Sequence, residues 1–143
     1  EKLRELSTSL GMGMWHQRKA EDLMQSGEAV DLEEALTYAK EALAISSRQD
    51  FHPLIWKLLI RLQTDAHLNE LVKLTTDAIP NHRFNKRTRS VAARYLVGAY
   101  IQLGDFNNAH RSFEQYKSGF PPGVAATIQA SIRSRNIGEA RWL

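Results

Sequence analysis

The sequence predicts an all-α protein, built as an α-solenoid of about four antiparallel helical hairpins wound into a right-handed superhelix. Apolar residues recur at the three- and four-residue spacing of one helix face, as in Leu32, Ala35, Leu36, Ala39 and Ala42. Alternation typical of strands is missing, as are the Asn-Gly and Asp-Gly hairpin signals. Gly and Pro gather at a few places and divide the chain into short helices. The expected helices are 2–10, 14–26, 31–46, 53–63, 67–78, 87–103, 106–117, 122–134 and 136–143.

Local signals support the ends of several of these helices. The glycines at Gly11–Gly13 are expected to join the first two helices as a hinge or a tight packing contact. Asp31 is expected to be an N-cap, with Glu34 in the capping-box position. Pro53 suits the first turn of its helix, and Asp105 can cap the helix that follows it. Connections this short favour antiparallel hairpins.

The hairpins also show a repeat. Small or apolar residues hold the place where the second helix packs on the first: Ala35, then Leu71 or Val72, then Ala109, then Ala140. They are spaced by about 31–38 residues, a period typical of helical repeats that bury their faces by stacking on neighbours. A non-repetitive helical bundle is the alternative. We therefore expect one helical-repeat domain over 1–143, with units at about 12–47, 52–80, 87–122 and 123–143, the last incomplete.

The composition narrows the possible classes of protein. The chain has 143 residues, of which 43% are hydrophobic and 24% are charged, as in globular proteins. No apolar run approaches the roughly 18–20 residues of a membrane span, so no membrane insertion is expected. The absence of Cys excludes disulfides, thiolate metal sites and Cys nucleophiles. The chain does not begin with Met, and we expect it to be a fragment of a longer one.

Charge is unevenly distributed along the chain. Residues 1–50 hold 10 Asp/Glu against 6 Lys/Arg, whereas residues 81–143 hold 10 Lys/Arg against 3 Asp/Glu. The densest feature is the basic stretch His82–Tyr95, which contains no acid and suits phosphate binding. A solvated charged face is the alternative interpretation. The positive charges in this stretch are Arg83, Lys86, Arg87, Arg89 and Arg94.

The stretch "YLVGAYIQLGDFNNAHRSFEQYKSGFPP" resembles a pentatricopeptide repeat, and "DLEEALTYAKEALAI" resembles the second helix of a tetratricopeptide repeat. "TIQASIRSRNIGEARWL" is similar to the start of a further unit, but it has Ser131 and Arg135 where the family has Tyr and Gly. The residues that match the pentatricopeptide pattern in the first of these stretches are Leu96, Val97, Tyr100, Gly104, Ala109, Phe113, Tyr116, Gly119 and Pro121.

The pentatricopeptide resemblance implies a protein that binds single-stranded RNA, usually in mitochondria or chloroplasts, with one base read per repeat. The family's first-helix reading position falls at Tyr95 in the third unit and near Lys57 in the second. These are not the small polar residues that the family's code prefers, so the expected contact is sequence-tolerant: stacking on Tyr95 and attraction of phosphates. The candidate RNA- or partner-binding residues are Arg83, Lys86, Arg87, Arg89, Arg94, Tyr95 and Lys57.

The second hypothesis is a tetratricopeptide-like scaffold that holds a partner peptide or protein in its groove. An enzyme is not expected, because the five His are scattered and none forms an i, i+4 pair around a Glu. No cofactor or metal is expected. Trp15, Trp56 and Trp142 have the spacing of core or inter-repeat residues. The apolar end "ARWL" is expected to be covered by further repeats, by a partner or by self-association.

Overall fold

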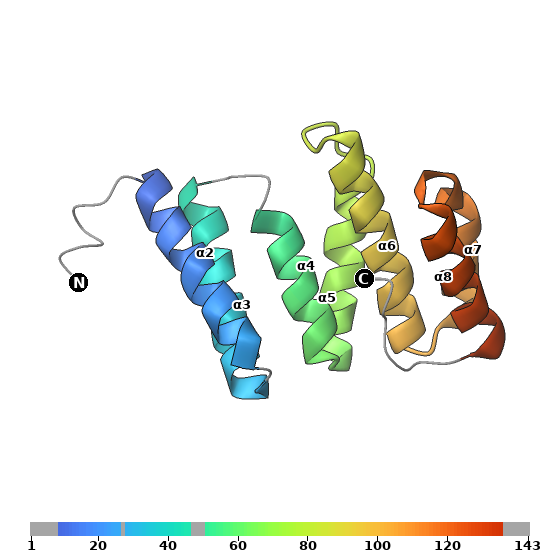
Figure 1. Cartoon of the computed structure of the whole chain (residues 1–143), viewed down its shortest axis with the longest axis horizontal. Coiled ribbons are helices and arrows are strands. Elements are labelled where there is room, and N and C mark those ends of the chain that lie inside the picture. Colours follow the sequence, from blue (N-terminus) through green and yellow to red (C-terminus); the bar gives the residue numbers. More distant parts are fainter. Residues whose placement is uncertain (1–8, 27, 47–50, 136–143) are drawn as a thin grey trace. The chain divides into compact units, whose positions relative to one another are not determined.

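The computed structural model describes residues 9–26, 28–46 and 51–135, and Figure 1 shows how they form helices. No β-strand occurs among these residues, so the prediction of an all-α protein is confirmed. The chain divides into two compact units, Glu1–Leu62 and Gln63–Leu143. The boundary falls inside the stretch 52–80 that the sequence predicts as one hairpin. The helices are α2 (Ser9–Ser26), α3 (Ala29–Ser46), α4 (Phe51–Leu62), α5 (Asp65–Ala78), α6 (Lys86–Gln102), α7 (Phe106–Tyr116), the 3₁₀ helix η1 (Lys117–Gly119) and α8 (Pro122–Ser134).

In the first unit, α2 and α3 lie side by side (Figure 1) and pack on each other. Ala35, Ala39 and Ala42 are all buried, as their predicted place on the packing face of α3 requires. Small side chains allow the two helices to approach closely. The buried His16 of α2 joins them further, since its Nε2 lies 2.8 Å from Oε2 of Glu41 on α3.

Two predictions about this unit are wrong. The predicted break at Gly11–Gly13 does not occur, because α2 is continuous from Ser9 to Ser26. Each Gly inside a helix costs about 1 kcal/mol relative to Ala, a cost that the packing of α2 on α3 outweighs. Asp31 is not an N-cap, because α3 begins at Ala29 and Asp31 lies in its first turn. An acid there still interacts favourably with the helix dipole.

Helix α4 packs on α3 and is the most apolar helix of the first unit. Pro53 lies in its first turn, as predicted, and Trp56 is fully buried, which confirms its expected core role. Arg61 donates from Nη1 to the main-chain oxygen of Met24 at 3.5 Å, which ties the end of α4 to the last turn of α2. The buried residues of α4 are Phe51, Leu54, Ile55, Trp56, Leu58, Leu59 and Ile60.

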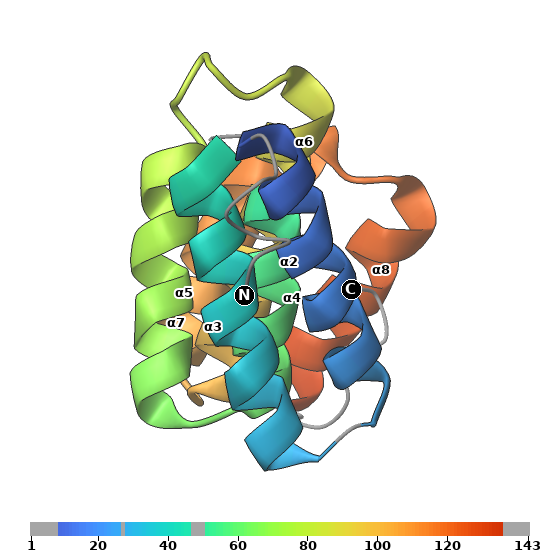
Figure 2. The ribbon, with the colours of Figure 1, turned by 90° about the vertical axis from the view of Figure 1, so that its left-hand side faces the viewer.

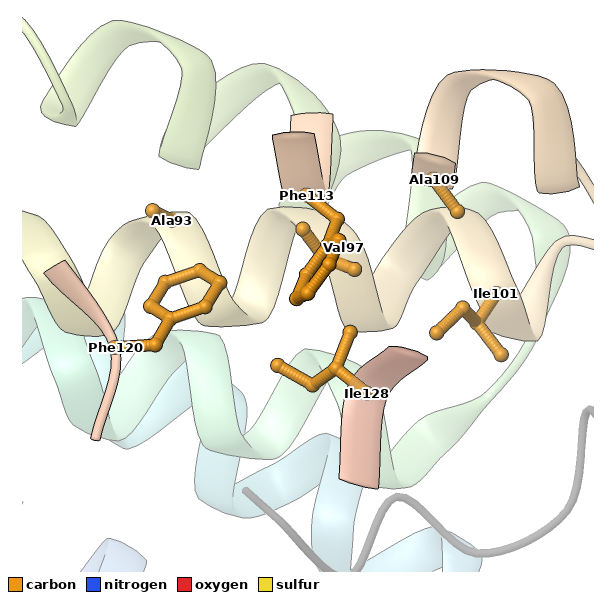
Figure 3. Close-up of a cluster of buried hydrophobic side chains, with 7 residues drawn as sticks. All are labelled: Ala93, Val97, Ile101, Ala109, Phe113, Phe120 and Ile128. Atoms are coloured by element: carbon orange, nitrogen blue, oxygen red, sulfur yellow. The ribbon is translucent and has the colours of Figure 1, made fainter. Parts of the chain in front are cut away.

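In the second unit, consecutive helices pack on one another: α5 on α6, α6 on α7 and α7 on α8. Their core contains a cluster contributed by α6, α7, the segment after η1, and α8, which Figure 3 shows. Ala109 is buried, in agreement with the packing place that the repeat pattern assigns to it, and Phe113 of the pentatricopeptide-like stretch is buried as well. The superhelical path and its handedness stay predictions. The cluster consists of Ala93, Val97, Ile101, Ala109, Phe113, Phe120 and Ile128.

The turn between α6 and α7 forms as the sequence predicts. Gly104 has a φ of +77°, a left-handed conformation that Gly adopts without steric cost. Its N–H donates to the carbonyl of Ile101 at 2.9 Å, which closes the end of α6. Asp105 then caps α7, because its Oδ1 accepts from the backbone N–H of Asn108 at 3.2 Å. The predicted helix 136–143, with Ala140 and Trp142, lies outside the described residues.

Candidate functional site

The basic stretch lies on the connection between α5 and α6, residues 79–85, and on the first half of α6 (Figure 2). Hydrogen bonds within this connection hold it in a defined turn. The side-chain oxygen of Asn81 accepts a hydrogen bond from the backbone N–H of Arg83 at 3.0 Å. The main-chain oxygen of Asn81 accepts one from the backbone N–H of Phe84 at 3.1 Å. Phe84 is buried and anchors the turn to the protein. The positive charges around it are therefore carried by an ordered backbone.

Three of the predicted cations are exposed at the start of α6. Arg83 precedes the helix, and Lys86 and Arg87 are its first two residues. Asn85 caps the helix, because its Oδ1 accepts from the N–H of Thr88 at 2.8 Å. No acid lies in the first turn, and positive side chains there are opposed by the helix dipole. This end of α6 is consequently an electropositive surface.

Arg89 has a different role, because it stabilises the fold. Its Nε donates to the main-chain oxygen of Ile79 at 2.7 Å, across a separation of ten residues. Ile79 is the C-cap of α5, where helix carbonyls lack partners within the helix. A positive group at a helix C-terminus is also favoured by the dipole. Arg89, which is half-buried, therefore joins the start of α6 to the end of α5.

Arg94 and Tyr95 lie deeper than the sequence predicts. Arg94 is half-buried, and its Nε is buried without a hydrogen-bond partner among the described residues. Tyr95 is buried, with 7% of its surface exposed, so its ring offers little area to a base. The stacking role predicted for Tyr95 is therefore corrected to a core role. Lys57 is exposed on α4 in the first unit.

A hollow of about 360 Å³, the α6 groove, opens beside Lys86, one of the three exposed cations. It is formed by the start of α6, the end of α7 and the residues that follow α7. Its walls include two positive side chains and an aromatic ring, and none of the described residues lining it is Asp or Glu. The lining residues are Lys86, Arg89, Ser90 and Ala93 from α6, Gln115 and Tyr116 from α7, Ser118 and Gly119 from η1, and Ile79.

One hydrogen bond fixes the two walls of the α6 groove relative to each other. Ser90 Oγ donates to the main-chain oxygen of Gly119 at 2.8 Å. A Cβ added at Gly119 would lie 3.4 Å from the same Oγ, so the two segments approach closely. The sequence identified Tyr116 only as one of the residues that match the pentatricopeptide pattern. No local pattern could have shown that it shares a hollow with Lys86, because the two lie 30 residues apart in the sequence.

A second hollow, of about 620 Å³, lies between α7 and α8. Its lining is mixed, since it includes His110 and Arg111 but also Glu114. A hydrogen bond from Lys117 Nζ, at 2.7 Å, lowers the pKa of Glu114, which favours its charged form. Arg135 lies over the ring of Phe106, with 5.7 Å from its Cζ to the ring centroid. The acid makes this hollow less suited to an anion than the α6 groove.

Among the described residues, no group of three or more His, Asp or Glu is placed to hold a metal ion. None of their helices combines the length and apolar character that a bilayer crossing requires. Comparisons of the chain with protein-family models, with curated proteins and with solved structures gave no match. The resemblance to pentatricopeptide repeats therefore stays a prediction from the residue pattern.

Proposed function

We propose that this chain is a non-catalytic binding module that contacts the phosphates of single-stranded RNA through the basic stretch. In this proposal it is a mitochondrial gene-expression factor built from pentatricopeptide-like repeats in a right-handed α-solenoid. The fold by itself carries no function, so the proposal depends on the chemistry of the surface.

The observation that carries the proposal is the exposure of Arg83, Lys86 and Arg87 together at the capped start of α6. No Asp or Glu occurs between Asp77 and Asp105 in the sequence. Positive charge at a helix N-terminus is unfavourable in the free protein, and a bound phosphate would compensate it. Arg and Lys are also the residues that neutralise phosphates in nucleic-acid complexes.

The test is the binding of a labelled single-stranded RNA over a series of salt concentrations. The test variant is Arg83→Ala/Lys86→Ala/Arg87→Ala, which leaves Arg89 and Arg94 in place because both are partly inside the fold. Each phosphate contact with a single strand contributes about −0.7 to the slope of log K against log salt. We expect the triple variant to lose affinity and to flatten the slope by about 2.

A matched control removes the same charge from other exposed places in the same unit. Lys73→Ala/Arg111→Ala/Arg133→Ala takes one cation from each of α5, α7 and α8. We expect the slope of this control to stay closer to that of the wild type. Equal flattening in both variants would show diffuse attraction and reject a site at α6. An absence of RNA binding at low salt would reject the RNA proposal as a whole.

A second candidate function, a scaffold for a partner protein, is favoured by the surface of the first unit. Trp15 is 37% exposed and Val30 is 77% exposed, and large apolar side chains left at a surface can mark a protein contact. Trp15 contacts Tyr38 edge to face, with 5.6 Å between ring centroids. Of the two roles predicted for Trp15, core or inter-repeat residue, its exposure contradicts the core role. Isothermal titration with a basic, apolar peptide, using Trp15→Ala as the variant, would test this function.

A further inference from the structure

We propose that the α6 groove holds one nucleotide of the bound RNA, with a phosphate on Lys86 and Arg89 and the base against the ring of Tyr116. The inference rests on the proposed function, since it requires that the chain binds RNA. It adds a stacking residue that differs from the one the sequence predicts.

The phosphate of the nucleotide is placed at the end of the groove where its two cations lie. Lys86 is the first residue of α6 and Arg89 lies about one turn further along, so both point from the same end of the helix. The bond to Ile79 uses one of the five N–H donors of the Arg89 guanidinium and fixes its position. The other four belong to the Nη groups, whose fork geometry suits phosphate oxygens. A preorganised arginine loses little side-chain entropy when an anion binds.

The base of the nucleotide is placed against Tyr116 because of where the ring of this residue lies. Its ring is half-buried: it packs against the core cluster of the second unit and also lines the groove. Ile79 and Ala93 contribute further apolar surface to the same hollow. An aromatic ring held by the core is a rigid platform, and stacking tolerates any base because every base has a π face. This agrees with the sequence-tolerant contact that the residues predict.

The size and polarity of the groove match a nucleotide. Its volume of about 360 Å³ lies at the lower end of the range of roughly 300–1,000 Å³ for small-molecule sites. Gln115 and Ser118 add polar groups that can hydrogen-bond a base edge or a ribose. Because no acid is among the described lining residues, an anionic ligand is favoured over a basic peptide. The groove therefore combines charge, aromatic surface and polar groups in one place.

The first test compares an oligouridylate with an abasic strand that has the same number of phosphates, by fluorescence anisotropy at one salt concentration. Stacking of one base predicts that the oligouridylate binds the wild type about 5- to 150-fold more tightly. Tyr116→Leu keeps apolar packing but removes the ring, and we expect most of that preference to disappear. Tyr116→Phe keeps the ring and is expected to retain it. Thermal melting of each variant checks that the fold is intact.

A second measurement uses the wild-type chain alone, in case Tyr116→Leu does not fold. RNA containing 4-thiouridine is cross-linked to the protein with light, and the modified peptides are identified by mass spectrometry. We expect cross-links within residues 115–119. Equal binding of both strands, or cross-links only at other places, would reject the nucleotide site while leaving phosphate binding intact. If neither strand binds the wild type at low salt, the proposed function itself fails.

Discussion

Replacement of Arg89 by Ala should destabilise the protein, although Arg89 is one of five cations in the basic stretch. The side chain holds the main-chain oxygen of Ile79 at 2.7 Å and so supplies the end of α5 with a partner from α6. Arg89→Ala removes this bond and also removes a positive charge from the C-terminal end of the α5 dipole. The neighbouring Arg87 is exposed and has no such role in the structure.

The magnitude follows from the type of bond and its burial. A hydrogen bond to a charged group contributes about 1.5–3 kcal/mol, and a charge at a helix terminus contributes about 0.3–1 kcal/mol. Arg89 is only half-buried, so water replaces part of the lost bond. We expect a decrease of about 1–2 kcal/mol in the free energy of unfolding. For a chain of this length, that corresponds to a Tm lower by roughly 3–8 °C.

The assay is urea denaturation and thermal melting, followed by far-UV circular dichroism, of the wild type, Arg89→Ala, Arg89→Lys and Arg87→Ala. Arg89→Lys keeps the charge but loses the Nε donor, so an intermediate stability is expected. Arg87→Ala is a surface change and should stay within about 0.5 kcal/mol of the wild type. If Arg89→Ala were as stable as Arg87→Ala, the bond to Ile79 would not stabilise the fold. The only remaining role for Arg89 would then be contact with a ligand.

Two further changes test the core and the pH dependence. Phe113→Ala opens a cavity in the cluster of the second unit and should lower the free energy of unfolding, measured by urea denaturation, by about 3–5 kcal/mol. Phe113→Leu should lower it clearly less. Similar values for both variants would show that the ring is not tightly packed. Burial lowers the pKa of His52, so the unfolded chain takes up a proton more readily than the folded protein and protonation favours unfolding. The contribution of His52 to stability is therefore complete above pH 6.5, and it decreases as the pH falls toward the lower pKa of the folded protein. Relative to the wild type, His52→Asn should therefore lose less stability between pH 7.5 and about pH 5, and parallel stability curves for the two proteins would contradict this.

Much of the fold could be predicted because its signals are local. The helical spacing of apolar residues, the proline in the first turn of α4 and the Gly104–Asp105 turn all act within a few residues. The burial of Ala35 and Ala109 also followed from the repeat pattern. The break predicted at Gly11–Gly13 failed because helix propensity is a weak preference that packing overrides.

The candidate site could be predicted only in part. The positive charge of the basic stretch is a property of composition, so the sequence locates it directly. The separate roles of its members depend on contacts between distant segments, such as Arg89 with the end of α5. A spacing pattern indicates which residues share a helix face, but it does not show which face packs inward when both carry mixed residues. Tyr95 was assigned to the surface because the reading position of the pentatricopeptide family falls on it, and it is buried.

The sequence by itself thus determined the all-α class, most helix positions and the basic character of residues 82–95, because these depend on composition and on short-range spacing. The tertiary structure alone decided which cations are exposed, which one stabilises the fold and which aromatic ring lies beside them. Tyr116 and Lys86 line the same hollow because α7 packs on α6, with Ser90 bonded to Gly119. The packing of whole helices brings such distant residues together, and no short segment of the chain contains the information that determines this packing.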